Sequence, residues 1–323
     1  MNAAVVRAFD APPVYTPFED PTPQPSEKLV QVRAAGLHQI VRGIAAGSHY
    51  LSMDKLPFIP GVDGVGVLED GTRVYFGGAR FPYGTMCEQT VIDDIKGVLM
   101  VIPLPEGIED AVAAGIANPG MSSWVALDRG RFVAGESVLI LGATGTSGQL
   151  AVQIAKARGA RRVIAAGRNP EALARLKALG ADSVISLTQE PDALVAAFRE
   201  EFAANGVDVI LDYLCGPPAE SVLSAIAQKG AIKSGTRVRF VQIGSLAGPN
   251  ILLPASTLRS ANLEILGSGF GSASMDDIRK GIAEFFSLCA AKKIEFAYKT
   301  AHLREVETLW NAKGSGERLV FVP

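Results

Sequence analysis

The chain has 323 residues, 48% of them hydrophobic, which is enough for about two domains of roughly 100–200 residues with cores of their own. Lysine and arginine number 31 against 33 aspartate and glutamate residues, so a nucleic-acid or polyanion partner is not expected. No apolar stretch approaches the ~20 residues of a membrane-spanning helix, and the N-terminus lacks a signal peptide pattern. Three separated cysteines, Cys87, Cys215 and Cys289, favour a reducing, cytoplasmic setting.

The first 120 residues predict short strands joined by turns. Residues 29–34 alternate in hydrophobicity as a half-buried strand does, and prolines mark the loops of this region. Residues 121–127 predict the start of a helix that leads into a second region. We therefore expect the first region to be an irregular, mostly β unit.

From residue 137 onward, short apolar strands alternate with helical segments. The expected strands are 137–141, 162–166, 183–185, 207–211, 239–243 and 263–266, and the expected helices are 147–158, 171–179, 191–205 and 219–228. This alternation is typical of an α/β fold with a doubly wound parallel sheet. Residues 276–291 then predict an amphipathic helix, and residues 318–322 predict a strand that returns to the first domain.

A glycine-rich turn follows the first of these strands. It comprises Gly142, Ala143, Thr144, Gly145, Thr146, Ser147 and Gly148. Its glycines would let the pyrophosphate of a dinucleotide approach the backbone, and the N-terminus of the next helix supplies free N–H groups. The spacing is GxxGxxG rather than GxGxxG, but the strand before it and the helix after it are the context of a dinucleotide fingerprint.

The second strand of this region ends in Gly167, Arg168 and Asn169. A unit that binds NAD usually places a carboxylate here for the ribose 2′-hydroxyl, whereas the first one in this chain is Glu171, beyond Pro170. Arg168 stands where a 2′-phosphate would need a cation, and Asn169 could add a neutral donor. The segment therefore favours NADPH as the cofactor, and a solvated loop arginine is the alternative.

Two further motifs indicate a family. Residues 56–67 have the sequence LPFIPGVDGVGV, and residues 176–185 have the sequence LKALGADSVI. Together with residues 142–148, they make the chain resemble the medium-chain dehydrogenase/reductase superfamily. Within it, the chain is most similar to the zinc-independent quinone oxidoreductase branch, to which zeta-crystallin belongs. The resemblance runs from Val30 to Val322.

The resemblance implies a Rossmann NADP-binding domain at residues 121–270 and a mostly β, GroES-like catalytic domain at residues 1–120 and 271–323. It also implies a substrate cleft beside the nicotinamide, at the carboxyl ends of the parallel strands. The further cofactor contacts that it implies are Asn118, Asp212, Gly244, Ser245, Gly267, Ser268, Gly269 and Phe270. For the residues at strand ends, plain turns are the alternative interpretation.

The zinc ligands of the superfamily's alcohol dehydrogenases are missing at the matching positions. Those enzymes carry a cysteine, a histidine and a second cysteine, where this chain has His38, Val62 and Asn118. Valine cannot bind a metal, and asparagine is a poor zinc ligand. The four-cysteine structural lobe of those enzymes is absent as well. We therefore expect no metal site.

Three side chains are candidates for the chemistry. His38 stands where many quinone reductases have asparagine, so the substrate pocket departs from the family pattern. Tyr50 matches a tyrosine that serves as proton donor in related enoyl-thioester reductases, and His49 is the competing donor. A pocket-wall role for Tyr50, a core role for His38 and the absence of any essential acid remain alternatives.

The expected function is the NADPH-dependent reduction of a small molecule, a quinone or an α,β-unsaturated carbonyl compound, by hydride transfer without zinc. The alternatives are an alcohol dehydrogenase of the zinc type and a non-catalytic NADPH-binding protein. We also expect a homodimer that pairs through residues 263–270, because zinc-free relatives commonly pair through such an edge strand.

Overall fold

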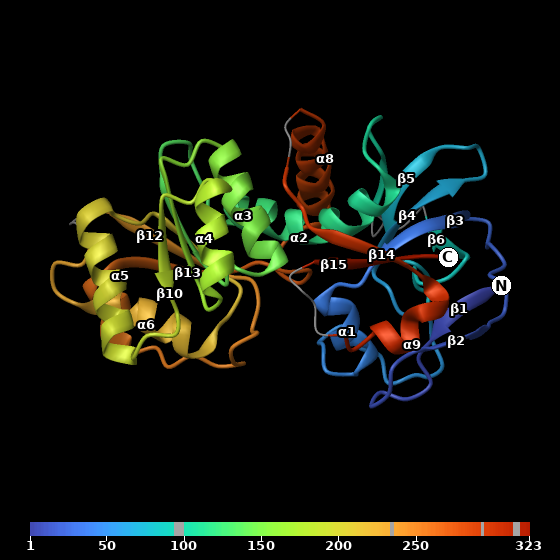
Figure 1. Ribbon diagram of the computed structural model, residues 1–323, viewed down its shortest axis with the longest axis horizontal. Helices are drawn as coiled ribbons and strands as arrows, with labels where there is room; N and C mark the ends of the chain where they lie inside the picture. The colour runs from blue at the N-terminus through green and yellow to red at the C-terminus, as the bar shows by residue number, and fades with distance from the viewer. Residues whose placement is uncertain (94–99, 233–235, 292–293, 313–316) are drawn as a thin grey trace. The chain divides into compact units, whose positions relative to one another are not determined.

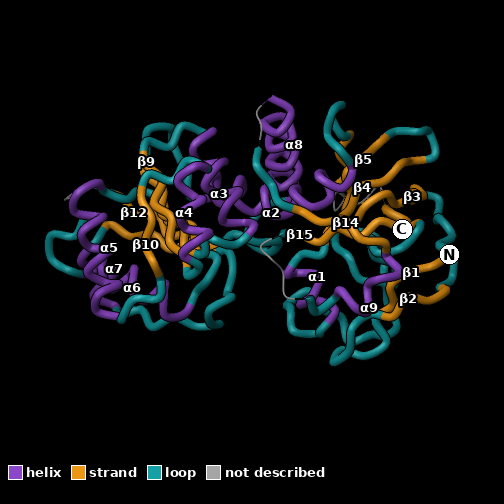
Figure 2. The backbone as a smooth tube through the Cα atoms, viewed as in Figure 1, coloured by secondary structure: helices purple, strands orange, loops and turns teal. Residues whose placement is uncertain are grey.

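A computed structural model describes residues 1–93, 100–232, 236–291, 294–312 and 317–323. The chain forms two compact units. Unit 1 comprises Met1–Pro119 and Met275–Pro323, and unit 2 comprises Gly120–Ser274. The sequence places the corresponding divisions after residues 120 and 270. Figure 1 colours the chain by residue number and Figure 2 by secondary structure.

Unit 2 is built on a parallel sheet (Figure 2). Its strands are β8 (Ser137–Leu141), β9 (Arg162–Gly167), β10 (Ser183–Ser186), β11 (Val209–Asp212), β12 (Arg237–Gln242) and β13 (Asn262–Gly267). Their order in the sheet is β10-β9-β8-β11-β12-β13. The chain thus starts in the middle of the sheet and winds first to one edge and then to the other. This is the order of dinucleotide-binding sheets, and it confirms the predicted fold class.

The helices of unit 2 follow the strands as predicted. They are α3 (Thr146–Ala157), α4 (Pro170–Ala178), α5 (Pro191–Asn205), α6 (Gly216–Ala227) and the short α7 (Ala255–Ser260). All five residues of β8 are buried, as the continuous apolar sequence of a central parallel strand predicts. Leu139 and Ile210 of neighbouring strands share a core with Phe198 and Phe202 of α5. The strands are parallel, so their carboxyl ends lie at one edge of the sheet.

Unit 1 contains a mostly antiparallel sheet and a small hairpin. The hairpin pairs β1 (Asn2–Val5) with β2 (Val14–Pro17). The main sheet has the order β14-β15-β3-β4-β5-β7, and β6 also pairs with β3. Its strands are β3 (Glu27–Gly36), β4 (Asp63–Leu68), β5 (Arg73–Gly77), β6 (Gln89–Asp93), β7 (Met100–Pro103), β14 (Tyr298–His302) and β15 (Arg318–Val322). Val320 of β15 pairs with Gly36 of β3, which confirms that the C-terminal strand returns to the first domain.

Several helices belong wholly or partly to unit 1. Helix α1 (Gln39–Ala45) follows β3, and η1 (Leu303–Glu305) and α9 (Val306–Leu309) follow β14. Helix α8 (Met275–Ala291) buries Ile278, Ile282, Phe285 and Phe286, so the predicted amphipathic pattern is confirmed. The prediction for residues 110–120 was wrong, because helix α2 (Asp110–Arg129) already begins at Asp110 and contains Pro119. The sequence Asn118-Pro119-Gly120 is typical of a turn, yet the eight helical residues before it, four of them alanine, support the helix.

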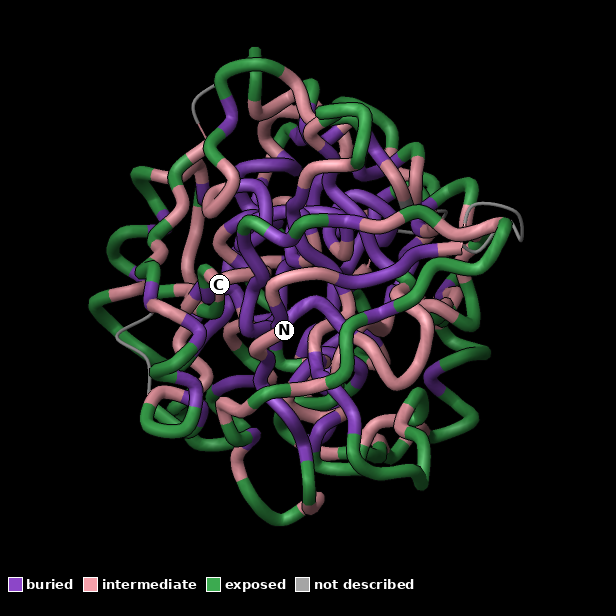
Figure 3. The backbone as a smooth tube through the Cα atoms, turned by 90° about the vertical axis from the view of Figure 1, so that its right-hand side faces the viewer, coloured by how far each residue is buried: buried purple, intermediate pink, exposed green. Residues whose placement is uncertain are grey.

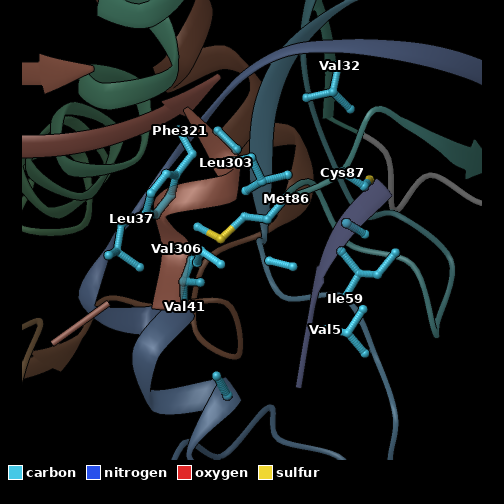
Figure 4. Packing of buried hydrophobic residues seen from close by; sticks show 14 of the residues in the cluster. Val5, Val32, Leu37, Val41, Ile59, Met86, Cys87, Leu303, Val306 and Phe321 are labelled. Atoms are coloured by element: carbon cyan, nitrogen blue, oxygen red, sulfur yellow. The ribbon is translucent and has the colours of Figure 1, made fainter. Parts of the chain in front are cut away.

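The core of unit 1 fixes the loop between β3 and α1. Leu37 of that loop and Val41 of α1, on either side of His38 in the sequence, pack in one cluster with Met86 and with Phe321 of β15 (Figure 4). Figure 3 shows buried stretches of the backbone in the interior, with exposed loops around them. No helix among the described residues is long and apolar enough to cross a membrane.

Candidate cofactor and substrate site

The glycine-rich turn after β8 requires glycine at two of its positions. Gly142 has a φ of +88°, which side chains with a Cβ rarely adopt. A Cβ on Gly148 would lie 2.3 Å from the carbonyl oxygen of Gly142 and 2.5 Å from the Cα of Ala143. The first turn of α3 therefore sits directly against the end of β8, with no room for a side chain between them.

Helix α3 offers unoccupied donors at its N-terminus. Its N-cap, Gly145, has no side chain to cap the helix, and the first turn contains no acidic residue. The first helical hydrogen bond is donated by Gln149 N to Gly145 O over 2.9 Å. The N–H groups of Thr146, Ser147 and Gly148 thus have no acceptor within the helix and are free to donate to an anion placed at its end. This arrangement is suited to a phosphate group.

The end of β9 lies beside this turn. The N–H groups of Gly142 and Ala143 both donate to Ala166 O, over 3.0 and 2.9 Å. A Cβ on Gly167 would lie 2.4 Å from the Cγ2 of Thr144. Two of the segments predicted to bind the cofactor are therefore in contact at the carboxyl edge of the sheet.

Arg168 and Asn169 have different local roles. Asn169 is the N-cap of α4, and its Oδ1 accepts a 2.9 Å hydrogen bond from Ala172 N. Arg168 is exposed, and its side chain makes no ion pair or hydrogen bond with any residue that the structure describes. Glu171 is likewise exposed on the first turn of α4. The exposed guanidinium of Arg168 is thus available to a ligand.

The residues predicted at the ends of β11 and β12 are also neighbours. Ile243 N and Gly244 N donate to Asp212 O over 2.8 and 3.1 Å. The carboxylate of Asp212 is buried and accepts hydrogen bonds from Leu214 N and Cys215 N. Burial raises the pKa of this carboxyl group, against the opposing effect of those two hydrogen bonds. Asp212 therefore stabilises the turn that follows β11. Ser245, which follows Gly244 after β12, is exposed.

The remaining predicted cofactor residues lie at the end of β13 and in α2. Ser268 N donates to Gln242 O over 2.9 Å, and Gly269 N donates to the Oγ of Ser272. The last residue of β13, Gly267, and the three residues after it therefore lie at the same sheet edge as the glycine-rich turn. Those three residues are Ser268, Gly269 and Phe270. Asn118 is half-buried in α2, in the part of that helix that belongs to unit 1.

The candidate proton donors His49 and Tyr50 lie in the segment after α1, and their rings contact each other at a tilt of 33°. Their ring centroids are 4.2 Å apart, and Tyr50 is 68% exposed. The Nδ1 of His49 accepts a 3.2 Å hydrogen bond from Leu51 N, and burial lowers the pKa of the His49 imidazole. His49 is thus held as a neutral ring near pH 7, which makes it a weaker acid than an imidazolium.

His38 lies in a different environment, beside two residues that the sequence analysis did not select. Its Nε2 is 3.3 Å from the Oδ1 of Asp63, and the other carboxylate oxygen of Asp63 accepts a 2.5 Å hydrogen bond from the hydroxyl of Tyr75. Asp63 and Tyr75 lie on β4 and β5, 25 and 37 positions after His38. Asp63 could have been selected from the sequence, because it is a carboxylate inside the glycine-rich motif of residues 56–67. Its contacts with His38 and Tyr75 could be found only in the folded structure, where the strands are paired.

The positions that match the zinc ligands of alcohol dehydrogenases are occupied by His38, Val62 and Asn118. Val62 packs against the hydrophobic core of unit 1. No cluster of three or more histidine, cysteine, aspartate or glutamate side chains suited to a metal occurs in the described ranges.

Comparison with known proteins places the chain in a family. A zinc-binding dehydrogenase family model matches residues 148–287. A probable NADPH-dependent quinone reductase of Emericella nidulans, tdiC, is 30% identical over an alignment that covers both chains completely. A mouse quinone oxidoreductase is 27% identical over 87% of this chain and 83% of its own length.

Solved structures agree with these relatives. The quinone oxidoreductase of Thermus thermophilus, whose structure was determined alone and with NADPH, has a TM-score of 0.79 and 26% identity over the whole of both chains. The sheet order, the glycine-rich turn and these similarities point to the same conclusion. The chain belongs to the medium-chain dehydrogenase/reductase superfamily, in its quinone oxidoreductase branch, and is an oxidoreductase.

Proposed function

We propose that the protein is an NADPH-dependent oxidoreductase that reduces quinones or α,β-unsaturated carbonyl compounds without zinc. The observation that carries the proposal is the anion-binding arrangement at the carboxyl edge of the unit 2 sheet, where the uncapped N-terminus of α3 lies beside the end of β9 that carries Arg168. The printed names of the relatives in Emericella and mouse support the quinone part.

The residues present fit NADPH. Gly148 lets the first turn of α3 pack directly against the end of β8. That first turn would hold the pyrophosphate, and Arg168 would hold the 2′-phosphate. When bound, NADPH supplies the hydride. The segments after β11, β12 and β13 offer mainly small residues and backbone groups to the rest of the cofactor, including Gly244 and Gly267.

The residues do not fit the zinc of an alcohol dehydrogenase, because Val62 has no donor atom and Asn118 is a poor ligand. Without a metal to polarise the carbonyl group, a side chain of the protein would supply the proton that the reduced substrate takes up. The phenol of Tyr50 can donate its proton to the α-carbon of an enolate, with the phenolate then reprotonated by water. A quinone product is stabilised by its own aromatic ring and needs this donor less.

A two-step assay tests the proposal. Fluorescence titration with NADPH and NADH first measures binding. NADPH consumption is then followed across quinones, enones, enals and enoyl thioesters with chelator-treated protein. We expect binding and turnover of at least one quinone or enone. Tight binding without turnover on the whole panel would favour a non-catalytic NADPH-binding protein, and alcohol oxidation that depends on zinc would favour the alcohol dehydrogenase alternative.

We further propose a homodimer that pairs through β13. This strand ends the order of the unit 2 sheet, and it carries the exposed Ile265, with Leu258 of α7 also exposed. An unpaired edge with exposed apolar side chains is a surface that proteins usually cover. Light scattering at micromolar concentration should report twice the chain mass of 33.9 kDa, and a 33.9 kDa particle would refute the dimer.

A cytoplasmic location is proposed on the state of the cysteines. Cys87, Cys215 and Cys289 are all free, as is usual for proteins of a reducing compartment. Fractionation of the source cells with an antibody to this chain would test it, and recovery outside the cytoplasm would contradict it.

A further inference from the structure

Unit 1 contains a buried polar cluster that the proposed function does not yet use. Asp63 is fully buried at the start of β4. One of its carboxylate oxygens accepts a hydrogen bond from the hydroxyl of Tyr75, and its backbone oxygen accepts a 2.8 Å hydrogen bond from Thr85 Oγ1. His38, on the loop before α1, is 2% exposed. The carboxylate is thus held rigidly from one side, and the imidazole lies on the other.

The packing around His38 brings its ring close to Asp63. A Cβ on Gly36 would lie 2.6 Å from both Cε1 and Nε2 of His38, so glycine at this position makes room for the imidazole. Leu37 and Val41 anchor the two sides of the loop in the core (Figure 4). Packing against buried residues, rather than contact with solvent, therefore determines the position of the His38 ring.

The hydrogen bonds of this cluster are incomplete. Nε2 of His38 and Oδ1 of Asp63 are 3.3 Å apart, which is within ion-pair distance. Neither atom, nor Nδ1 of His38, has a hydrogen bond of good geometry to any described residue. Buried polar atoms without partners are unfavourable, and catalytic hydrogen bonds are often long or misaligned before substrate binds. The arrangement is that of a site which a ligand completes.

Charged groups from two other elements surround the pair. Arg318 of β15 donates a 2.9 Å hydrogen bond to Leu37 O, next to His38. Burial, followed by the repulsion of Arg42 on α1, lowers the pKa of Arg318 to about 10, whereas Asp63 opposes that shift. The Nε atoms of Arg42 and Arg318 are buried without partners among the described residues. The cluster thus carries more positive than negative charge, and a group that gains negative charge would be stabilised there.

We propose that Asp63 is a positioning residue for His38. In the substrate complex, Asp63, oriented by Tyr75, accepts the Nε2–H of His38. Nδ1, which is buried without a partner among the described residues, becomes the nitrogen that interacts with the carbonyl oxygen of the substrate. Burial and the neighbouring carboxylate raise the pKa of Tyr75 well above its usual value. Its hydroxyl therefore stays protonated and remains the donor to Asp63.

The chemical role rests on the proposed function. When a quinone or an enone is reduced, the carbonyl oxygen receives the electron pair of the C=O π bond and becomes negative. In this step His38 would take up a proton from water at Nδ1 and donate the Nδ1–H hydrogen bond to this oxygen, while its Nε2–H stays on Asp63. The oxygen gains charge in both substrate classes, whereas protonation at carbon, assigned above to Tyr50, is needed for enones. Asp63 should therefore affect both classes alike.

The first test does not depend on activity. The chain has three histidines, so long-range proton–nitrogen spectra of ¹⁵N-labelled protein can be assigned with His49→Gln and His302→Gln variants. We expect Nε2 of His38 to carry a proton in the wild type. In Asp63→Asn, the hydroxyl of Tyr75 donates to the amide oxygen, so the amide N–H groups face Nε2. The His38 ring must then lose its Nε2 proton and carry the proton on Nδ1.

The second test measures kcat with a quinone and with an enone. Asp63→Asn should lower kcat by about tenfold or more for both, because a neutral ring is a weaker donor than a charged one. KM for NADPH should stay unchanged. The matched control is Asp110→Asn, a carboxylate of unit 1 that pairs with Arg73. Tyr75→Phe, which leaves the charge of Asp63 in place, provides a second variant if Asp63→Asn does not fold.

The outcomes separate the two proposals. An unprotonated Nε2 in wild-type His38, or a tautomer that Asp63→Asn does not change, would overturn the positioning role even if the enzyme is fully active. An inverted tautomer with unchanged kcat on both substrates would overturn the catalytic consequence. If the wild type reduces no quinone or enone, the proposed function fails, and the spectra still decide whether Asp63 positions His38.

Discussion

The candidate sites of the two units consist of different chemical groups. In unit 2, the site consists of backbone groups and of positions where a side chain would not fit, such as Gly142, Gly148 and Gly167. In unit 1, it consists of side chains: His38, Asp63 and Tyr75 come from three separate elements, and Tyr50 from a fourth segment. A cofactor with constant chemistry can be held by a constant backbone shape, whereas a substrate is recognised by side chains that vary.

This difference predicts how substitutions will behave. Changes in unit 1 should alter turnover, at Tyr50 mainly with enones and at Asp63 with quinones and enones alike. Changes in unit 2 should alter cofactor affinity or stability regardless of the substrate.

Tyr50→Phe should lower kcat for enones by about 100- to 10,000-fold, the usual range for one positioned general acid. It should change kcat for quinones by no more than a few-fold. The substitution keeps the ring that contacts His49 and removes only the hydroxyl. Steady-state kinetics on both substrate classes measures the split, with Tyr83→Phe as the control for loss of a phenol elsewhere in unit 1. Equal, small losses on both classes would reduce Tyr50 to a packing role.

Arg168→Ala should raise KM for NADPH by about 10- to 100-fold, because a hydrogen bond to a charged group contributes ~1.5–3 kcal/mol. KM for NADH should stay almost unchanged, since NADH has no 2′-phosphate. Wild-type protein should prefer NADPH. Arg175→Ala, which removes an exposed arginine from α4, is the matched control. If Arg168→Ala weakens both cofactors equally, Arg168 is a solvated loop residue and the cofactor preference has another origin.

Gly148→Ala should destabilise the protein by about 1–3 kcal/mol, because its Cβ would overlap backbone atoms that cannot move independently. Gly145→Ala, in the same turn, should be tolerated much better, since the nearest atom to its Cβ is 3.6 Å away. Chemical denaturation of both variants without cofactor gives the two free energies of unfolding. Equal effects at the two positions would show that backbone packing is not what selects glycine in this turn.

Removal of metal should have no effect on activity. Protein treated with a chelator should contain well under one zinc per chain and keep its turnover with quinones or enones, because Val62 and Asn118 cannot complete a zinc site. Metal analysis by mass spectrometry together with the NADPH assay measures both quantities. Stoichiometric zinc whose removal abolishes turnover would contradict the zinc-free mechanism.

Much of unit 2 could be predicted because its signals are local. The apolar strand 137–141, the glycines after it and the helix that follows are neighbours in sequence, and the boundaries of β8 and α5 match the predicted ones residue for residue. The start of α2 could not be predicted in the same way. Pro119 and Gly120 are typical of a turn, but the helix continues through them to Arg129.

The fold class, the order of strands and helices in unit 2, the position of the glycine-rich turn and the separate motifs that identify the family could all be predicted from the sequence. Each of these depends on residue types within a few positions of one another, whose periodicity and steric needs are the same in any tertiary context. Only the tertiary structure decided that His38 faces Asp63 rather than His49 and Tyr50, that Tyr75 holds that carboxylate, and that Arg318 reaches the same loop from the far end of the chain. Those contacts depend on the pairing of β3 with β4 and β15, and a buried polar group acquires its function from partners that such pairing supplies.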